Sequence, residues 1–338
     1  MSDDASILAS TPRAAGYRMP AEWSPHRATW IAWPHNPDDW PGKFSPIPWV
    51  YAEIVRHLAE VEDVEIVVDD AAMERTARRA LRHAGASTAR VYFHRWPTNR
   101  VWTRDSGPIF VERIDPSLPG PRLGLTNWKF NAWAKYDDWQ LDDQLPAHIA
   151  RDLKIPEWMP THGDRRIVLE GGSIDVNGSG TLMTTEECLL SEVQARNPGL
   201  PREDLEAVLG EYLGIEQVLW LGRGIVGDDT HGHVDDVARF VGESTIVAAV
   251  EPHRAIRTTW RSPRTSSDCM RRVPRTAART ASSNCPCRRR FPSTASAYPP
   301  VTRTSTSQTN LFWCLRSTTG TIGAPSRSSR GSFQAERS

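Results

Sequence analysis

Three short segments concentrate side chains that could do chemistry. Asp105 lies in NRVWTRDSGP (99–108), after a strand-like run and before a Gly-Pro break, and Glu170 precedes two glycines in VLEGGS (168–173). The third segment, GDDTHGHVDD (227–236), places four carboxylates and two histidines within ten positions. Taken singly, Asp105 fits half of a local ion pair or a turn cap, and Glu170 fits a strand that ends at a bulge.

The histidine-rich segment leaves three interpretations open. Side chains two residues apart share one face of an extended strand, so we expect His231, His233 and Asp235 to form one row. A His-x-His-x-Asp row suits zinc or iron. The other interpretations are a solvated polar loop, and general acid-base use of His233 beside an orienting carboxylate.

Helix-like and strand-like stretches alternate from Pro48 onward, which is typical of an α/β domain. We expect helices at 49–61, 71–84 and 202–214, the last of which stops at Gly214. The expected strands are 65–70, 89–95, 101–112 (broken at Gly107-Pro108), 166–176, 180–185, 216–222, 234–242 and 244–251. The polar segments therefore lie near strand ends.

The charge of the chain is divided unevenly. The whole chain has 41 basic and 41 acidic side chains. Residues 252–338 hold 16 Arg, no Lys and two acids, a net charge of 16−2=+14, so residues 1–251 carry 25−39=−14. The tail has too little apolar surface to offset the entropy of ordering the chain, and we expect it to be disordered.

The sequence gives no sign of a membrane or of disulfides. No run of about 18 apolar residues occurs, and no basic N-terminal region leads into an apolar one, so we expect a cytoplasmic protein. The odd number of cysteines, five, favours reduced thiols. Cys285-Pro-Cys287 is too closely spaced and too isolated for a zinc site.

Motifs along the body resemble the agmatine deiminase family and stand in the family's order. The matching segments are GYRMPAEWSPHRATWIAWPHNPDDWP (16–41), NRVWTRDSGP, NWKFNAW (127–133), LEGGS, TTEECLLS (184–191), RNPG (196–199) and DDTHGHVDDVARFV (228–241). The family is also called the bacterial type of peptidyl-arginine deiminase. The resemblance implies a pentein fold, a fivefold pseudo-symmetric α/β propeller of ββαβ units, at residues 17–251. This propeller is incomplete in the chain, and an N-terminal segment, 1–16, precedes it.

The resemblance assigns roles that the chemistry of a guanidinium explains. A flat cation with forked N–H groups matches carboxylates, so its site needs acids from different strands. By resemblance, Asp105 and Asp235 bind the substrate, Glu170 and His233 are catalytic, and His233 relays protons to ammonia and from water. Trp102 packs along the aliphatic arm of the substrate, or is simply a core tryptophan. The reaction requires no metal or other cofactor.

The family nucleophile has no counterpart in this sequence. In the family, a cysteine near the C-terminus attacks the guanidinium carbon, within a glycine-rich stretch ending His-Cys. Cys188 matches a structural segment and is expected to be buried and inert, and Cys314 in LFWCLRS lacks the flanking glycines and histidine. Residues 297–314 can be encoded by codons that, read two nucleotides later, spell the family-like LPASYANFYIANELVLV. We therefore hypothesise a frameshift between about Pro252 and Ile256.

The predicted function is hydrolysis of agmatine to N-carbamoylputrescine and ammonia, in putrescine and polyamine biosynthesis, with this chain inactive for want of the cysteine. Action on arginine or peptidyl-arginine is one alternative, and a non-catalytic guanidinium-binding remnant is another. Nucleic-acid binding by the Arg-rich tail is a third, disfavoured because the tail lacks Lys and permits the alternative reading frame. The resemblance also allows a homo-oligomer.

Overall fold

The computed structural model describes residues 10–118 and 120–249. In this part of the chain, Tyr17–Arg18 (β1), Ile109–Arg113 (β5), Leu123–Thr126 (β6) and Glu157–Trp158 (β7) form one sheet in the order β1-β5-β6-β7. The other sheets are smaller. The described residues also form several short helices and strands, which are Pro37–Asp39 (η1), Thr103–Ser106 (α4), Ala132–Ala134 (η2), Asp142–Gln144 (η3), Thr161–His162 (β8), Arg165–Arg166 (β9) and Gly171–Ser173 (η4).

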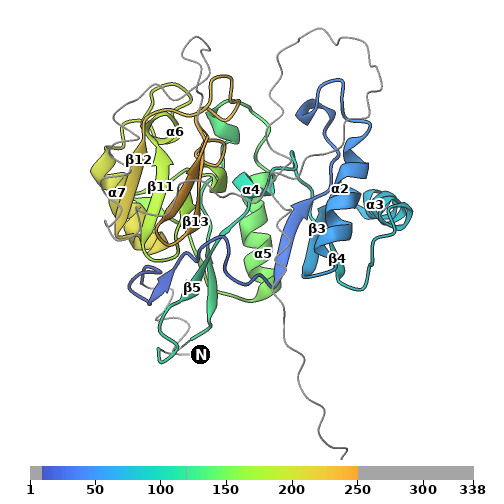
Figure 1. The fold of residues 1–338 in the computed structure, drawn as a ribbon, viewed down its shortest axis with the longest axis horizontal. Coiled ribbons are helices and arrows are strands. Elements are labelled where there is room, and N and C mark those ends of the chain that lie inside the picture. Colours follow the sequence, from blue (N-terminus) through green and yellow to red (C-terminus); the bar gives the residue numbers. More distant parts are fainter. Residues whose placement is uncertain (1–9, 119, 250–338) are drawn as a thin grey trace, which may run out of the picture. The chain divides into compact units, whose positions relative to one another are not determined.

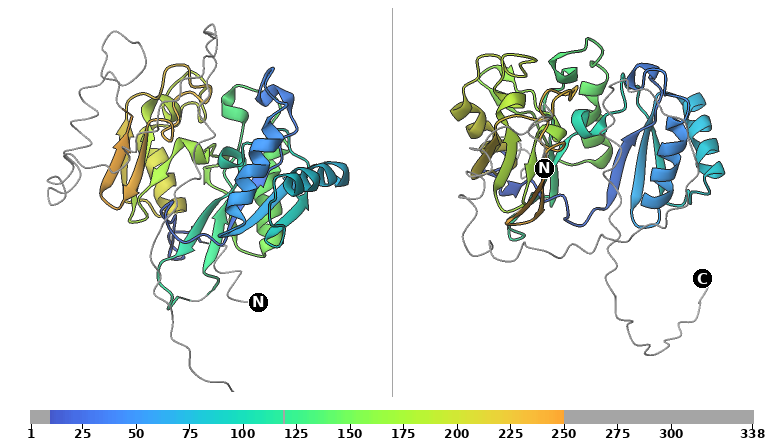
Figure 2. Two further views of the ribbon diagram at one scale, coloured as in Figure 1. Left: turned by 45° about the vertical axis from the view of Figure 1, so that its right-hand side comes forward. Right: turned by 45° about the horizontal axis from the view of Figure 1, so that its top comes forward.

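A parallel three-stranded sheet begins the chain's α/β pattern. Ala28–Ala32 (β2), Asp63–Val68 (β3) and Val91–Arg95 (β4) are joined by helices Ile47–Leu58 (α2) and Ala71–His83 (α3). The two helices lie on the same face of the sheet (Figures 1 and 2). Alternate side chains of β3 face these helices, whereas Val67 faces Leu145–Leu153 (α5), which packs on the opposite side.

Two ββαβ units follow. In the first, β5 and β6 are antiparallel, and α5 leads to β7, which pairs parallel with β6. In the second, Asp175–Val176 (β10) and Thr181–Thr185 (β11) are antiparallel, and Arg202–Leu213 (α7) leads to Gln217–Leu221 (β12), parallel with β11. Glu186–Leu189 (α6) follows β11 directly, and Ala238–Gly242 (β13) and Thr245–Ala248 (β14) form an antiparallel hairpin. The α/β class is therefore confirmed, and the fivefold propeller stays a prediction.

Local signals placed three of the longer helices, whereas α5, β2 and β6 were not predicted from the sequence. The helices expected at 49–61, 71–84 and 202–214 are α2, α3 and α7, with ends shifted by up to three residues. Asp70 caps α3 by accepting from the backbone N–H groups of Ala72 and Met73. Gly214 ends α7 in the left-handed conformation at φ 68°, as its position predicted.

Two of the expected strands form only in part. The stretch 101–112 is interrupted by the helical turn α4, because Asp105 N and Ser106 N both donate to the Trp102 carbonyl, and β5 starts only after Gly107-Pro108. The stretch 166–176 is broken by η4, where Ser173 N turns back to the Glu170 carbonyl at 3.1 Å. Each break carries one of the predicted site carboxylates, because Asp105 lies in α4 and Glu170 directly precedes η4.

Several predictions fall outside the described residues. They are the disordered tail at 252–338, the interpretations of Cys285, Cys287 and Cys314, and most of the N-terminal segment 1–16. Ser10 to Gly16 are described, and Arg13 N donates to the Glu211 carbonyl of α7 at 3.0 Å. None of the described helices is long and apolar enough to span a membrane.

Candidate functional site

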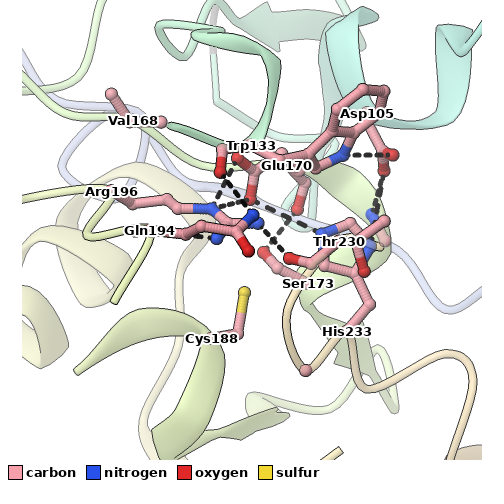
Figure 3. A network of polar contacts seen from close by, with 12 residues as sticks. Asp105, Trp133, Val168, Glu170, Ser173, Cys188, Gln194, Arg196, Thr230 and His233 are labelled. Carbon is pink, nitrogen blue, oxygen red and sulfur yellow. Dashed lines mark hydrogen bonds and ion pairs between the residues drawn. The ribbon is translucent and has the colours of Figure 1, made fainter. Parts of the chain in front are cut away.

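Three segments far apart in the sequence bring their ionisable side chains to one place. His233 Nε2 lies 3.6 Å from Glu170 Oε2, and His233 Nδ1 lies 3.9 Å from both Asp105 Oδ1 and Asp235 Oδ1. Figure 3 shows Asp105, Glu170 and His233 facing one another. The structure thus brings together the four acid and histidine residues singled out from the sequence.

Exposure falls steadily from one side of this cluster to the other. The Asp235 side chain is 16% exposed, that of Asp105 9%, that of His233 3% and that of Glu170 0%. A ligand arriving from solvent would therefore meet Asp235 and Asp105 before Glu170. The substrate-binding and catalytic roles that the resemblance implied for these four residues stay a prediction.

The loop that carries His233 is not the extended strand expected from the sequence. His231 and Gly232 have φ of 62° and 94°, in the left-handed region, so the alternation of faces is lost. Asp228 Oδ2 organises this loop by accepting from Gly232 N at 2.7 Å and His233 N at 3.0 Å. His231 Nε2 instead lies 3.3 Å from Ser191 Oγ, so the expected His231, His233, Asp235 row is wrong.

The paired glycines after Glu170 are needed for close approach. A Cβ on Gly171 would lie 2.3 Å from the Arg104 carbonyl oxygen. A Cβ on Gly172 would lie 2.5 Å from His233 Nδ1 and 2.7 Å from Asp105 Oδ1. The Gly172 backbone N–H also donates to Asp105 Oδ1 at 3.0 Å, so this glycine both admits and orients the carboxylate.

Arg196 is a site residue to which the sequence analysis gave no role. Its side chain and that of Glu170 are both fully buried, and Arg196 Nε lies 3.0 and 3.3 Å from the two Glu170 oxygens. Arg196 also donates to the carbonyls of Gln194, at 3.0 Å, and Thr230. It therefore joins Glu170 to the loop that carries His233 (Figure 3). The RNPG motif was the available signal, but the motif does not reveal the partner.

These contacts control the charges in the cluster. Burial alone would raise the pKa of Glu170, but the charge of Arg196 and the nearby His233 outweigh it, so the pKa is lowered. Burial opposes protonation of His233, yet the carboxylates of Asp105, Glu170 and Asp235 raise its pKa to about 9. Burial, with repulsion from Asp235 and Glu170, raises the pKa of Asp105 against the attraction of His233. At neutral pH, Glu170 is a carboxylate and His233 an imidazolium.

Trp133 is a second partner that sequence reasoning missed. Its indole Nε1 donates to Asp105 Oδ2 at 3.0 Å, and both residues are buried. Ala132, Trp133 and Ala134 all have left-handed φ, at 48°, 59° and 51°. Such a conformation costs about 1–2 kcal/mol per residue for residues other than glycine. The motif NWKFNAW was available, but nothing local indicated this turn.

Trp102 is held beside the cluster by different contacts. Its indole N–H donates to Asp39 Oδ1 at 3.2 Å, and its ring lies 5.3 Å from the Trp40 ring, centroid to centroid. Its backbone carbonyl starts the turn that carries Asp105. These contacts fix the ring, and its packing against a substrate arm stays a prediction.

Cys188 is the one cysteine within the described ranges, and its burial is confirmed. It is the third residue of α6, and its backbone N–H donates to Oγ1 of the capping residue Thr185 at 3.0 Å. Burial raises the pKa of its thiol well above the usual value, which disfavours a thiolate nucleophile. Its sulfur and ligand atoms of Glu170 and His233 lie within 4.8 Å of one another. The Glu170 carboxylate is already paired with Arg196, and a protonated His233 has no lone pair for a metal ion. These three side chains therefore favour an ion-pair network over a metal site.

The solved structures that resemble this fold include agmatine deiminases. An agmatine deiminase of Enterococcus faecalis, described as catalysing its reaction, matches 72% of this chain and 64% of its own, with TM-score 0.64 and 34% identity. A cysteine-to-serine variant of C. jejuni agmatine deiminase, solved with substrate bound, matches 75% of this chain and 71% of its own, with TM-score 0.62 and 26% identity.

Sequence comparison identifies the family. The profile of the Porphyromonas-type peptidyl-arginine deiminases matches residues 18–274, and the chain belongs to this family. The agmatine deiminase of Stutzerimonas stutzeri (strain A1501) is 40% identical over 249 residues, which are 72% of this chain. The chain spans 63% of the length of that relative. The profile match continues past Glu251, where the domain predicted from the sequence ends.

Proposed function

We propose that the cluster of Asp105, Asp235, Glu170 and His233 binds the guanidinium group of agmatine. The observation that carries this proposal is the graded burial of three carboxylates around one histidine, with Asp105 and Asp235 on the more exposed side. Two carboxylates can accept the forked N–H groups of one flat cation. Because Glu170 is already paired with Arg196, Asp105 and Asp235 supply most of the attraction for the incoming cation.

In the complete reaction, a cysteine thiolate would attack the guanidinium carbon and form an amidino-thioether. Ammonia would leave with a proton from His233, and water would then attack as the thiolate departs. The sum is agmatine plus water to N-carbamoylputrescine plus ammonia. The described residues offer only Cys188, whose burial and raised pKa do not suit the first step. We infer that the chain as written binds the substrate without turning it over.

A second candidate function, guanidinium binding without catalysis, is supported by a relative. The cysteine-to-serine variant of C. jejuni agmatine deiminase was solved with substrate bound. In that protein, loss of a cysteine is therefore compatible with binding. The analogous outcome here is ligand binding without ammonia release.

Agmatine is the preferred substrate in this proposal because of charge. Residues 1–251 carry a net charge of −14, which favours a small dication over an arginine that also bears a carboxylate. Arginine and peptidyl-arginine stay alternatives, distinguished by competition against agmatine. A role in putrescine biosynthesis, a cytoplasmic location, a fivefold propeller and a homo-oligomer belong to the same proposal.

The experiment that tests the function compares two proteins. One is the chain as written, and the other is translated from the gene with the frame corrected between about Pro252 and Ile256. Ammonia release from agmatine is expected only for the corrected protein. Turnover by the chain as written would contradict the proposed absence of a nucleophile, and Cys188→Ala and Cys314→Ala would then identify the thiol that reacts. An uninterrupted reading frame in the resequenced gene would contradict the frameshift.

A further inference from the structure

The turn at Ala132–Ala134 holds three consecutive residues in a conformation that L-amino acids rarely adopt. None of the three is glycine or asparagine, so the local sequence does not relieve the strain. Such backbone persists where the surroundings determine it, and it clusters at functional sites. We therefore expect this turn to position a side chain at a functional site.

Contacts from two directions hold the turn in place. The Asn131 side chain accepts from Ala134 N at 2.9 Å, and Gln194 Nε2 donates to the Trp133 carbonyl at 3.1 Å. The Trp133 ring packs edge-on against Phe130, with centroids 5.4 Å apart. Gln194 is two residues from Arg196, which binds Glu170, so the same segment supports the turn and the carboxylate cluster (Figure 3).

The turn delivers one hydrogen-bond donor to the site. Trp133 Nε1 donates to Asp105 Oδ2, while the Gly172 N–H donates to Asp105 Oδ1, both at 3.0 Å. Within the described part of the chain, each carboxylate oxygen therefore has one hydrogen-bond donor and retains a further lone pair. Two donors on opposite oxygens fix the rotation of the carboxylate plane, which a bidentate contact with a flat guanidinium requires.

We propose that Trp133 is a positioning residue that orients the Asp105 carboxylate for a guanidinium ligand. The proposal rests on the guanidinium-binding function proposed above. Trp133 acts through its indole N–H, which a phenylalanine in its place could not supply to Asp105. In this proposal, the left-handed turn at Ala132–Ala134 places the Trp133 indole N–H against the Asp105 carboxylate.

The test compares Trp133→Phe with Trp128→Phe. Trp128 is also buried and donates its indole N–H, to Thr126 Oγ1 at 2.9 Å, so its replacement removes the same chemical group away from Asp105. Agmatine affinity is measured by calorimetry for the full chain. Trp133→Phe should weaken binding about tenfold, equivalent to about 1.4 kcal/mol, and Trp128→Phe should leave it within about twofold.

A ligand-free measurement separates this proposal from the proposed function. Carbon-13 NMR of labelled aspartate carboxyls, assigned with Asp105→Asn, follows the titration of Asp105. Trp133→Phe should raise the pKa of Asp105, since a donor to the charged form is lost, and Trp128→Phe should not. If the unaltered chain fails to bind agmatine, the proposed function falls, and this titration still decides the role of Trp133.

A milder variant covers the case in which Trp133→Phe does not fold. Gln194→Ala removes the donor to the Trp133 carbonyl and leaves the ring in place. It should weaken agmatine binding in the same direction and raise the pKa of Asp105. Unchanged affinity and an unchanged Asp105 titration in the folded variants would overturn the proposal.

Discussion

Replacing Arg196 by methionine should be among the most costly single changes in this chain. Methionine fills a similar volume but leaves the Glu170 carboxylate buried, with His233, at 3.6 Å, as its remaining cationic partner among the described residues. Removing one partner of a fully buried ion pair costs about 3–5 kcal/mol when the remaining charge is uncompensated, and the His233 imidazolium offsets part of that cost here. The double variant Arg196→Met with Glu170→Met removes both charges and should recover most of this loss.

The assay is urea unfolding at pH 8 and pH 5, followed by tryptophan fluorescence. In the unaltered chain the pKa of Glu170 is lowered, so this group stabilises the fold above its ordinary pKa of 4.5. In Arg196→Met the pKa of Glu170 should instead rise, so the loss of stability should be smaller at pH 5 than at pH 8.

The matched control is Arg18→Met. Arg18 Nη2 lies 2.6 Å from Glu216 Oε1, but this pair is at the surface, where such pairs contribute about 0–1 kcal/mol. If Arg196→Met costs no more than Arg18→Met, the Arg196–Glu170 pair does not hold the site together and the reasoning is refuted.

Three further predictions concern the same cluster. NMR titration of His233 should show a pKa near 9; its folded pKa lies above the ordinary 6.5, so its stabilising charge is fully present below 6.5 and is lost as the pH rises through about 9. A midpoint at or below 6.5 would contradict the carboxylate surroundings. Gly172→Ala should abolish measurable agmatine binding, because its Cβ would collide with His233 and Asp105, whereas Gly242→Ala, which meets nothing closer than 3.8 Å, should bind as before. Iodoacetamide should label the Cys188 peptide only after unfolding, as mass spectrometry can show, and rapid labelling of the native chain would contradict its burial.

The sequence predicted elements whose causes are local. Helix α7 follows from its pattern and from Gly214 at its end, and α3 begins at a capping aspartate. The prediction of the site failed where a side chain that binds the backbone, rather than the periodicity of the sequence, decides the conformation. His231 and His233 do not share a strand face. The Asp228 carboxylate accepts from the backbone N–H groups of Gly232 and His233 and so holds this segment in a turn.

The partners of the site residues were harder to predict than the residues themselves. Asp105, Glu170, His233 and Asp235 were identified by motif and do converge. Arg196 and Trp133 contact residues 26 and 28 positions away, and neither pairing leaves a periodic signal in the sequence. Their types gave no warning either, since an Arg in a polar loop and a Trp after an Asn-Ala pair are ordinary.

The most direct test of a guanidinium site is calorimetry of the chain with agmatine and with putrescine, its analogue that has an amine in place of the guanidinium. The geometry of Asp105 and Asp235 predicts that agmatine binds and that putrescine binds at least about tenfold more weakly, because an ammonium cannot span both carboxylates as a flat fork does. Equal affinity for the two, or no binding of agmatine, would contradict the central claim.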